Sequence, residues 1–347
     1  MVVIIYGTGK YGRKLYSFLC SYGIQVTCFC ETKVSGAEEI DGVPVIGVLD
    51  LQKRISAGTI IMIAVRNRNT SLQIKRRLTS IFLDTLKVVE CNSFIQDNLE
   101  MVEETGYGGH CILCDADVAA WRGGCPDEAQ NVRLFLEHHV IGGGYRATWQ
   151  CPLCGGVDRE RWLLWVLSRY TSIFWDKCCV LHFAPEPEVS LRIASNPDCD
   201  YYAGDIRPRK KMHNVDCTNI PFRDEMFDYI IANHVLEHIT DVDLAMHELW
   251  RVLKPDGRLV LSFPICTDLK TLERTDINTA ELRLKYYGQS DHVRLYGSDY
   301  LEQIEQYGWI ITVYSPKDMC SLEEIMRYGF IPDDVMMVAC KNVAKQL

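Results

Sequence analysis

The feature that most constrains the fold is a repeated alternation of short apolar runs with amphipathic stretches. In residues 1–105, runs rich in Val and Ile alternate with segments whose apolar residues recur at helical spacing, as Leu15, Phe18 and Leu19 do. Such alternation is typical of α/β folds, in which helices cover both faces of a parallel sheet. The expected strands of this first region are residues 2–6, 24–31, 42–48, 58–65 and 86–91, with helices over 10–22 and 74–83.

A second region of the same kind begins near residue 179. Its expected strands are residues 179–183, 199–205, 226–234, 258–264, 309–315 and 335–340. A helix over 241–253 is capped by Asp241 and stopped by a turn at the Lys-Pro-Asp-Gly sequence of 254–257. The sequence therefore predicts two doubly wound Rossmann-like units.

The segment between the two regions has a different composition. Residues 106–155 are rich in Gly and Cys and show no long periodicity, so something other than an apolar core must hold them together. A strongly amphipathic helix is expected over 156–175. With 347 residues, the chain is expected to contain three parts: 1–105, 106–155 and 156–347.

Net charge and hydropathy limit the classes of molecule that the protein is expected to bind. The net charge of −9 gives no general electrostatic reason to bind nucleic acid. No apolar run approaches the roughly 20 residues that span a bilayer, and no signal peptide is recognisable. We therefore expect a cytoplasmic protein with no membrane partner, whose 16 cysteines are reduced thiols with some available for a metal.

Two cysteine pairs in the middle segment have the spacing of a metal site. Cys111, Cys114, Cys151 and Cys154 form a C-x2-C-x36-C-x2-C pattern, and two-residue spacers let both sulfurs of a pair face one ion. Four thiolates predict a closed structural zinc site without a catalytic role. The alternatives are ordinary reduced cysteines in turns, or a site in which Cys125 or His110 replaces one ligand.

The first glycine-rich loop is the G-x-G-x-x-G sequence Gly7–Gly12, which follows a strand and opens a helix. Glu31 falls where a ribose-binding acid is expected. A complete six-strand dinucleotide fold does not fit in about 105 residues with these loops. The unit is therefore either a half-site for a nucleotide or nucleotide-linked sugar, or an interaction or homodimerisation domain that keeps its glycines for turn geometry.

The second region has an acidic residue at the end of its second expected strand. Asp205 lies nineteen residues after Glu186 and is placed to accept hydrogen bonds from both hydroxyls of a ribose. Asp216, beside Cys217, precedes an Ile-Pro-Phe sequence and could face an adenine edge. The loop after the first strand contains Phe183, Ala184, Pro185 and Glu186.

These motifs together resemble a class I S-adenosylmethionine-dependent methyltransferase of the type 11-like branch. The resemblance rests on VLHFAPEPE (180–188), DCTNIPF (216–222), FDYIIANHVLEHI (227–239) and RVLKPDG (251–257), with the cysteine pairs upstream, and covers roughly 106–342. The first loop departs from the superfamily because it lacks glycines. S-adenosylmethionine has no pyrophosphate to cradle, and an acid such as Glu186 suits its cationic amine.

The resemblance also implies roles for later residues. Asn233, His234 and Leu236 fall where the chain passes the methionyl part of the cofactor, and His234 or His238 is a candidate base. In the insert 286–297, His292 is a candidate base or acceptor ligand. Arg294 is a candidate anchor for an anionic acceptor.

The N-terminal GTGKYG and GVPVIG sequences resemble the small Rossmann-like domains of sugar-modifying transferases, so a sugar or other secondary metabolite is the expected methyl acceptor. Two alternatives remain: an NAD-dependent or nucleotide-sugar enzyme that uses Gly7–Gly12, and a non-catalytic zinc-ribbon adaptor.

Overall fold

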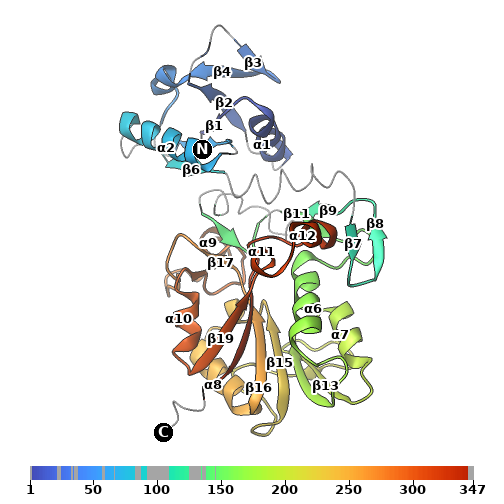
Figure 1. Ribbon diagram of the computed structural model, residues 1–347. Coiled ribbons are helices and arrows are strands. Elements are labelled where there is room, and N and C mark those ends of the chain that lie inside the picture. The colour runs from blue at the N-terminus through green and yellow to red at the C-terminus, as the bar shows by residue number, and fades with distance from the viewer. Residues whose placement is uncertain are drawn as a thin grey trace. The chain divides into compact units, whose positions relative to one another are not determined.

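The computed structural model divides the chain into two compact units, Met1–Glu104 and Thr105–Leu347. It describes residues 2–21, 25–32, 34, 38–56, 59–65, 67–82, 87–91, 109–124, 134, 138–144 and 146–342. The first unit covers the region of the first α/β pattern. The cysteine segment and the second α/β pattern both belong to the second unit (Figure 1).

The first unit is built on one sheet with the strand order β3-β4-β2-β1-β5-β6. Its elements are β1 (Val3–Tyr6), α1 (Lys10–Ser21), β2 (Val26–Glu31), β3 (Glu38–Ile40), β4 (Val43–Gly47), the 3₁₀ helix η1 (Val48–Lys53), β5 (Ile60–Ile63), α2 (Arg68–Phe82) and β6 (Lys87–Glu90). The five expected strands are present and parallel. β3 is an additional antiparallel edge strand, so the sheet of the described residues has six strands rather than five.

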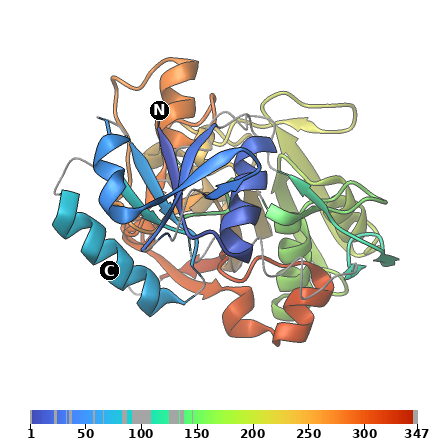
Figure 2. The same cartoon turned by 90° about the horizontal axis from the view of Figure 1, so that it is seen from above.

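Helices cover the two faces of this sheet. Tyr16 of α1 packs its ring on Phe29 of β2, with the ring centroids 5.4 Å apart. Leu78 of α2 belongs instead to the buried cluster of Ile4 and Ile61, which face the opposite side of the sheet from Phe29. Figure 2 shows α1 and α2 on opposite sides of this sheet. The α/β class is therefore confirmed for this unit. α2 begins six residues before the expected helix, where Asn67 accepts a hydrogen bond from the amide of Thr70 at 3.0 Å.

The second unit contains a seven-stranded sheet of order β14-β13-β12-β15-β16-β20-β19. Its strands are β12 (Cys178–Phe183), β13 (Cys199–Asp205), β14 (His213–Asn214), β15 (Phe227–Asn233), β16 (Leu253–Ser262), β19 (Trp309–Tyr314) and β20 (Met336–Lys341). The strands from β14 to β16 are parallel, and β20 pairs antiparallel with both β16 and β19. The order reverses between β12 and β15, where a parallel sheet opens a crevice at the carboxyl ends of its strands.

Helices connect and cover these strands. They are α6 (Asp158–Tyr170), α7 (Pro187–Ala194), the 3₁₀ helix η5 (Leu236–His238), α8 (Val242–Val252), α9 (Ala280–Tyr287), α10 (Tyr300–Glu305), α11 (Pro316–Met319) and α12 (Leu322–Tyr328). α6 is shorter than the expected helix over 156–175, because Thr171 takes an extended backbone and ends it. Among the helices of the described ranges, none is both long enough and apolar enough to cross a bilayer.

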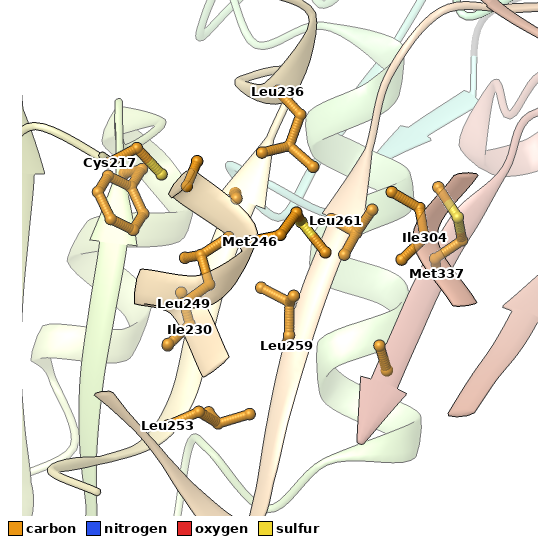
Figure 3. Close-up of a cluster of buried hydrophobic side chains, with 14 of the residues drawn as sticks. Cys217, Ile230, Leu236, Met246, Leu249, Leu253, Leu259, Leu261, Ile304 and Met337 are labelled. Atoms are coloured by element: carbon orange, nitrogen blue, oxygen red, sulfur yellow. The ribbon is translucent and has the colours of Figure 1, made fainter. Parts of the chain in front are cut away.

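The main core lies between α8 and the sheet. Met246 and Leu249 of α8 lie beside Leu261 and Ile230 of the central strands (Figure 3). All four side chains are fully buried. Each contributes roughly 1.5–3 kcal/mol to folding. This core fixes the strand ends that carry the polar residues described below.

The Lys-Pro-Asp-Gly sequence is not a turn separate from the next strand. α8 ends at Val252, one residue before the expected end of the helix, and β16 begins at once with Leu253. Leu253 pairs with Phe227 and Arg258 pairs with Tyr229, so the four residues 254–257 bulge out of the ladder. The expected turn is therefore corrected to a bulge inside β16.

Arg161 of α6 joins distant parts of the second unit. Its buried guanidinium donates to carbonyl oxygens of Gly156 at 3.3 Å and Gly329 at 3.1 Å, and also to that of Thr148. Its Nε donates to the carbonyl of Tyr328 at 3.0 Å. Burying a cation is costly unless its donors are satisfied, so these contacts hold the cysteine segment and the C-terminal strand region together.

A buried carboxyl, Asp334, makes the stability of the second unit depend on pH. Burial, reinforced by the charge of Asp158, raises its pKa to about 7, above the usual value near 3.9. The folded state therefore binds more protons than the unfolded state between about pH 4 and 7, and stability is lost as pH rises through this window. We expect Asp334→Asn to add on the order of 3–4 kcal/mol at pH 8 and little at pH 4.

Urea unfolding at both pH values measures this difference. Asp200→Asn, a change at an exposed residue of β13, is the matched control and should leave the pH dependence as it is in the unaltered chain. Parallel stability curves for Asp334→Asn and the unaltered chain would contradict the prediction.

Candidate functional site

The loop after β12 brings the first candidate residues to the switch point of the sheet. Ala184 has a positive φ of 43° and donates its amide to Gly204 O at 2.8 Å, which turns the chain sharply after the strand. Pro187 opens α7 and Glu186 precedes it as the N-cap residue. Phe183 is buried in the main core, so its side chain packs below the loop, while Ala184 is exposed and Pro185 is half-buried.

Glu186 is held by a buried hydrogen-bond network that involves residues of four strands. Its Oε2 lies 2.8 Å from His182 Nε2, and its Oε1 accepts from Asn233 Nδ2 at 2.6 Å. Asn233 Oδ1 in turn accepts from Ser262 Oγ at 2.5 Å, and His182 Nδ1 lies 3.0 Å from Tyr201 OH. Burial raises the pKa of Glu186, but the hydrogen bond and charge of His182 outweigh it and lower the pKa. The carboxylate is therefore fixed as an anion at the strand ends.

The two aspartates occupy the loops beside this network. Asp205 ends β13, and its Oδ1 accepts from the amide of Arg207 at 2.7 Å. Asp216 is exposed, and its Oδ1 accepts from the amide and hydroxyl of Thr218 at 2.8 and 2.7 Å. One oxygen of each carboxylate thus orders its own loop, and the second oxygen accepts no hydrogen bond from the residues that the structure describes. Cys217, by contrast, is buried in the main core, and burial raises the pKa of its thiol to about 12.

The HVLEH sequence forms a sharp turn after β15. His234 has a positive φ of 55° and donates its amide to Ser262 O at 2.9 Å. Its Nδ1 lies 3.1 Å from Glu237 Oε1, and burial lowers the pKa of the imidazole to about 4. His234 is therefore a weak base. Leu236 is fully buried in the core, so its side chain does not face the strand ends.

Glu237 and His238 of this turn form a cluster of ionisable side chains with His292. One ligand-type atom from each of Glu237, His238 and His292 lies within 4.8 Å of the others. His292 is buried, and burial lowers its pKa. Burial also lowers the pKa of His238, but the hydrogen bond to Asp291 outweighs it and raises the pKa. The structure thus places His292 beside Glu237 and His238 of the HVLEH turn. Within this cluster the pKa of His238 is raised and that of His292 is lowered.

The expected role of Arg294 as an acceptor anchor is corrected by its contacts. The side chain is buried, and it donates to Glu273 through Nε at 2.8 Å and Nη2 at 3.0 Å. Nη1 donates to Leu236 O and Ile239 O at 2.6 and 2.5 Å, and Nη2 also donates to Thr240 O at 3.3 Å. All five donors of the guanidinium are used, so Arg294 fixes the HVLEH turn and has none for a ligand.

The four cysteines of the middle segment converge. Cys111 and Cys114 lie on the hairpin of β7 (Gly109–Cys111) and β8 (Ala116–Val118), and Cys151 and Cys154 follow β11 (Arg146–Gln150). The sulfurs all lie within 4.8 Å of one another. Cys111 Sγ is 3.8 Å from Cys154 Sγ, and Cys114 Sγ is 3.9 Å from Cys151 Sγ. A tetrahedral zinc with Zn–S bonds of about 2.3 Å requires sulfurs roughly 3.8 Å apart, so the residues fit this ion.

His110 and Cys125 are the two alternative ligands expected for this cysteine group. His110 Nδ1 lies 2.9 Å from Asp117 Oδ1, and its Nε2 lies 3.1 Å from Asp115 Oδ1. Both ring nitrogens therefore face carboxylates rather than the sulfurs. Cys125 lies outside the described residues.

In the glycine-rich loop of the first unit, the backbone geometry requires glycine at some positions and not at others. Gly7 has a φ of 115°, and a Cβ at Gly12 would lie 1.9 Å from Gly7 O, so both positions require glycine for geometry. A Cβ at Gly9 would meet nothing within 4 Å. Glu31, the expected ribose acid, accepts from the amide and hydroxyl of Thr8 at 2.8 and 2.7 Å, so one of its oxygens orders the loop.

Several residues of the site are not among the sequence candidates. Ser262, His182 and Tyr201 complete the Glu186 network, and Glu237 is the buried acid of the HVLEH turn. Polar residues at the carboxyl ends of buried strands were the available signal for His182 and Ser262. The three-residue spacing of His234 and Glu237 on a tight turn was the signal for the acid.

Comparison with known proteins finds a family match in this region of the chain. Residues 179–261 match the family described as methyltransferase domain. The demethylmenaquinone methyltransferase of Streptomyces griseus is 35% identical over 146 residues, which are 40% of this chain and 59% of the relative. That of Streptomyces avermitilis is 39% identical over 69 residues, 18% of this chain and 30% of the relative. The chain thus spans less than two thirds of each of these relatives.

Solved structures of similar kind were also found. A SAM-dependent methyltransferase from Aquifex aeolicus has a TM-score of 0.34 at 16% identity and covers 54% of this chain and 90% of its own. A SAM-dependent methyltransferase from Archaeoglobus fulgidus has a TM-score of 0.35 at 13% identity. The match covers 53% of this chain and 94% of that one. Glu186, Asp205 and Asn233 all lie within the segment that matches this methyltransferase domain family.

Proposed function

We propose that this protein transfers the methyl group of S-adenosylmethionine to a small-molecule acceptor. The observation that carries the proposal is the placement of Glu186, Asp205 and Asn233 at the carboxyl ends of β12, β13 and β15, inside the segment that matches a methyltransferase domain. These strands flank the switch point, where parallel sheets bind ligands.

Each of these residues has a role that suits one part of the cofactor. The Glu186 carboxylate attracts the cationic amine and lies toward the sulfonium, and Asn233 fixes its orientation. Asp205 accepts from the ribose hydroxyls, and Asp216 faces the adenine edge. When bound, the cofactor supplies an electrophilic methyl group, and the protein aligns the acceptor in line with it and excludes water.

The acceptor is proposed to be a sugar or another secondary metabolite with a hydroxyl or an acidic carbon. The relatives are named for methylation of demethylmenaquinone and, in one case, a sterol, so the named acceptors of the family are small molecules. Removal of a proton from such an acceptor requires a base. Glu237 and His238 of the HVLEH turn, together with His292, are the candidate groups for this purpose.

Calorimetric titration of the purified, zinc-replete protein with S-adenosylmethionine tests the function. We expect binding in the micromolar range that is lost in Asp205→Ala and kept in Asp200→Ala, a change on the same strand. Binding of NAD or of a nucleotide-linked sugar instead would favour the N-terminal unit as the active part. Absence of S-adenosylmethionine binding would contradict the proposal.

We also propose that Cys111, Cys114, Cys151 and Cys154 hold a structural zinc ion. Four thiolates close the tetrahedron and leave no position for water or substrate, so the ion supplies stability rather than catalysis. Amides support the sulfurs: Leu153 N donates to Cys151 Sγ and Gly156 N to Cys154 Sγ, both at 3.4 Å.

The N-terminal unit has a second candidate function, as a half-site for a nucleotide or nucleotide-linked sugar. The observation in its favour is Gly9, which the fold itself does not require. A glycine at this position lets a phosphate approach the backbone. The titrations with NAD and a nucleotide-linked sugar described above test this site, and Gly9→Val should abolish any binding.

A further inference from the structure

The cluster beside the HVLEH turn combines two imidazoles with one carboxylate. One ligand-type atom each from Glu237, His238 and His292 lies within 4.8 Å of the other two. The two rings meet edge to face with their centroids 4.7 Å apart. Two histidines and a carboxylate form a ligand set for divalent transition metals.

Hydrogen bonds on the outer side of the cluster fix both imidazoles. His292 Nδ1 lies 3.2 Å from the carbonyl oxygen of Tyr287, and His238 Nδ1 lies 3.3 Å from Asp291 Oδ2. A carbonyl or carboxylate oxygen can only accept, so each Nδ1 carries the hydrogen and each Nε2 carries the lone pair. Metal-binding histidines are oriented in this way, by donating the other ring N–H to a carbonyl or carboxylate.

The carboxylate is arranged in the same manner. Glu237 Oε1 lies 3.1 Å from His234 Nδ1, which leaves Oε2 as the free oxygen. The Glu237 side chain is only 1% exposed. Its Oε2 is buried and has no hydrogen-bond partner among the described residues. A buried carboxylate oxygen without a partner is costly, and a cation in the cluster would satisfy it.

From these observations we propose that Glu237, His238 and His292 bind a divalent transition-metal ion, with Zn²⁺ and Fe²⁺ as the favoured candidates. Three protein ligands would leave the remaining coordination positions of such an ion open. This site is distinct from the cysteine group, which is closed and all-sulfur. Its three ligands come from η5 and from the loop before β18 (Tyr296–Gly297).

An open coordination position suggests what the ion does. An oxygen of the methyl acceptor could bind there, which would orient the acceptor and favour its deprotonated form. This role rests on the proposed methyltransferase function. The metal site itself rests only on the geometry of the three side chains.

Titration with Co²⁺ tests the site in the full chain. The probe is Co²⁺ added to zinc-replete protein, followed by absorbance and by metal analysis after gel filtration. We expect one equivalent of Co²⁺ beyond the zinc held by the cysteines, with no thiolate-to-cobalt charge-transfer band. His292→Gln and His238→Asn should each weaken this binding at least tenfold. His247→Gln, a change at an exposed histidine of α8, is the matched control and should bind as the unaltered chain does.

The outcomes separate this site from the rest of the protein. His238 is the partly exposed ligand, so His238→Asn keeps the test valid if His292→Gln fails to fold. The proposal is overturned if the unaltered chain takes up no extra Co²⁺, if the variants bind it unchanged, or if a thiolate band accompanies it. S-adenosylmethionine affinity is measured on the same samples. Metal binding without cofactor binding would reject the methyltransferase proposal and leave the metal site standing.

Discussion

Replacing Cys151 with serine is expected to release one zinc ion per chain and to lower the melting temperature of the second unit by more than about 10 °C. Cys151 is fully buried and its sulfur lies 3.9 Å from that of Cys114. A serine hydroxyl cannot replace a thiolate, so the ion would lose a ligand and most of its affinity. Binding of a structural zinc supplies roughly 10–16 kcal/mol in small zinc domains, and this energy is folding energy.

Metal analysis and differential scanning fluorimetry on the same sample measure both effects. Cys320→Ser is the matched control, because Cys320 is a half-buried thiol of the same unit that lies outside the cysteine group. It should keep the full zinc content and melt within about 2 °C of the unaltered chain. Equal zinc content in the Cys151→Ser and Cys320→Ser proteins would show that the cysteine group holds no ion.

Glu186→Gln is expected to weaken the binding of S-adenosylmethionine and S-adenosylhomocysteine by about 10- to 100-fold, while adenosine binds as before. The change removes the proposed charge-assisted hydrogen bond to the amine, an interaction worth on the order of 1.5–3 kcal/mol. It also places an amide N–H₂ next to Asn233 Nδ2 or His182 Nε2, which already approach the two oxygens at 2.6 and 2.8 Å. The effect is therefore confined to the methionyl end of the cofactor.

Calorimetry with the three ligands distinguishes the two acids of the site. Asp205→Ala should weaken all three, since each contains the ribose. Glu188→Gln, in the first turn of the helix that follows Glu186, is the control and should change none of them. Loss of adenosine binding in Glu186→Gln would mean that the substitution disturbs the whole pocket, and unchanged affinity for all three ligands would remove Glu186 from the site.

Local sequence signals were sufficient for most elements of the sheets. β13 has the bounds that the sequence predicts, because an Asn-Pro-Asp sequence precedes it and a charged loop follows. The cap at Asp241 is also confirmed, since its side chain accepts from Leu244 N at 3.0 Å. β3 was missed because its sequence, Glu-Glu-Ile, has neither alternation nor β-branched residues apart from Ile40.

Tertiary pairing decided what local signals could not. The register of β15 and β16 sets Ser262 opposite Asn233, and no periodicity in the sequence specifies that partner. Arg294 was misread for a related reason. An arginine in a polar insert has the same local pattern whether it faces a ligand or is buried. Only the fold shows that the carbonyls of Leu236, Ile239 and Thr240, in and just after the HVLEH turn, occupy its donors.

The contacts of Arg161 determine how this protein can be divided. A chain that begins at residue 156 would keep the Arg161 guanidinium of α6 but lose the Thr148 carbonyl that accepts from it. A cysteine segment produced alone would lose the guanidinium. Neither piece is a transferable module. Any exchange of this unit between proteins of the same architecture, in evolution or by engineering, would have to transfer the cysteine segment and the α12–β20 region together.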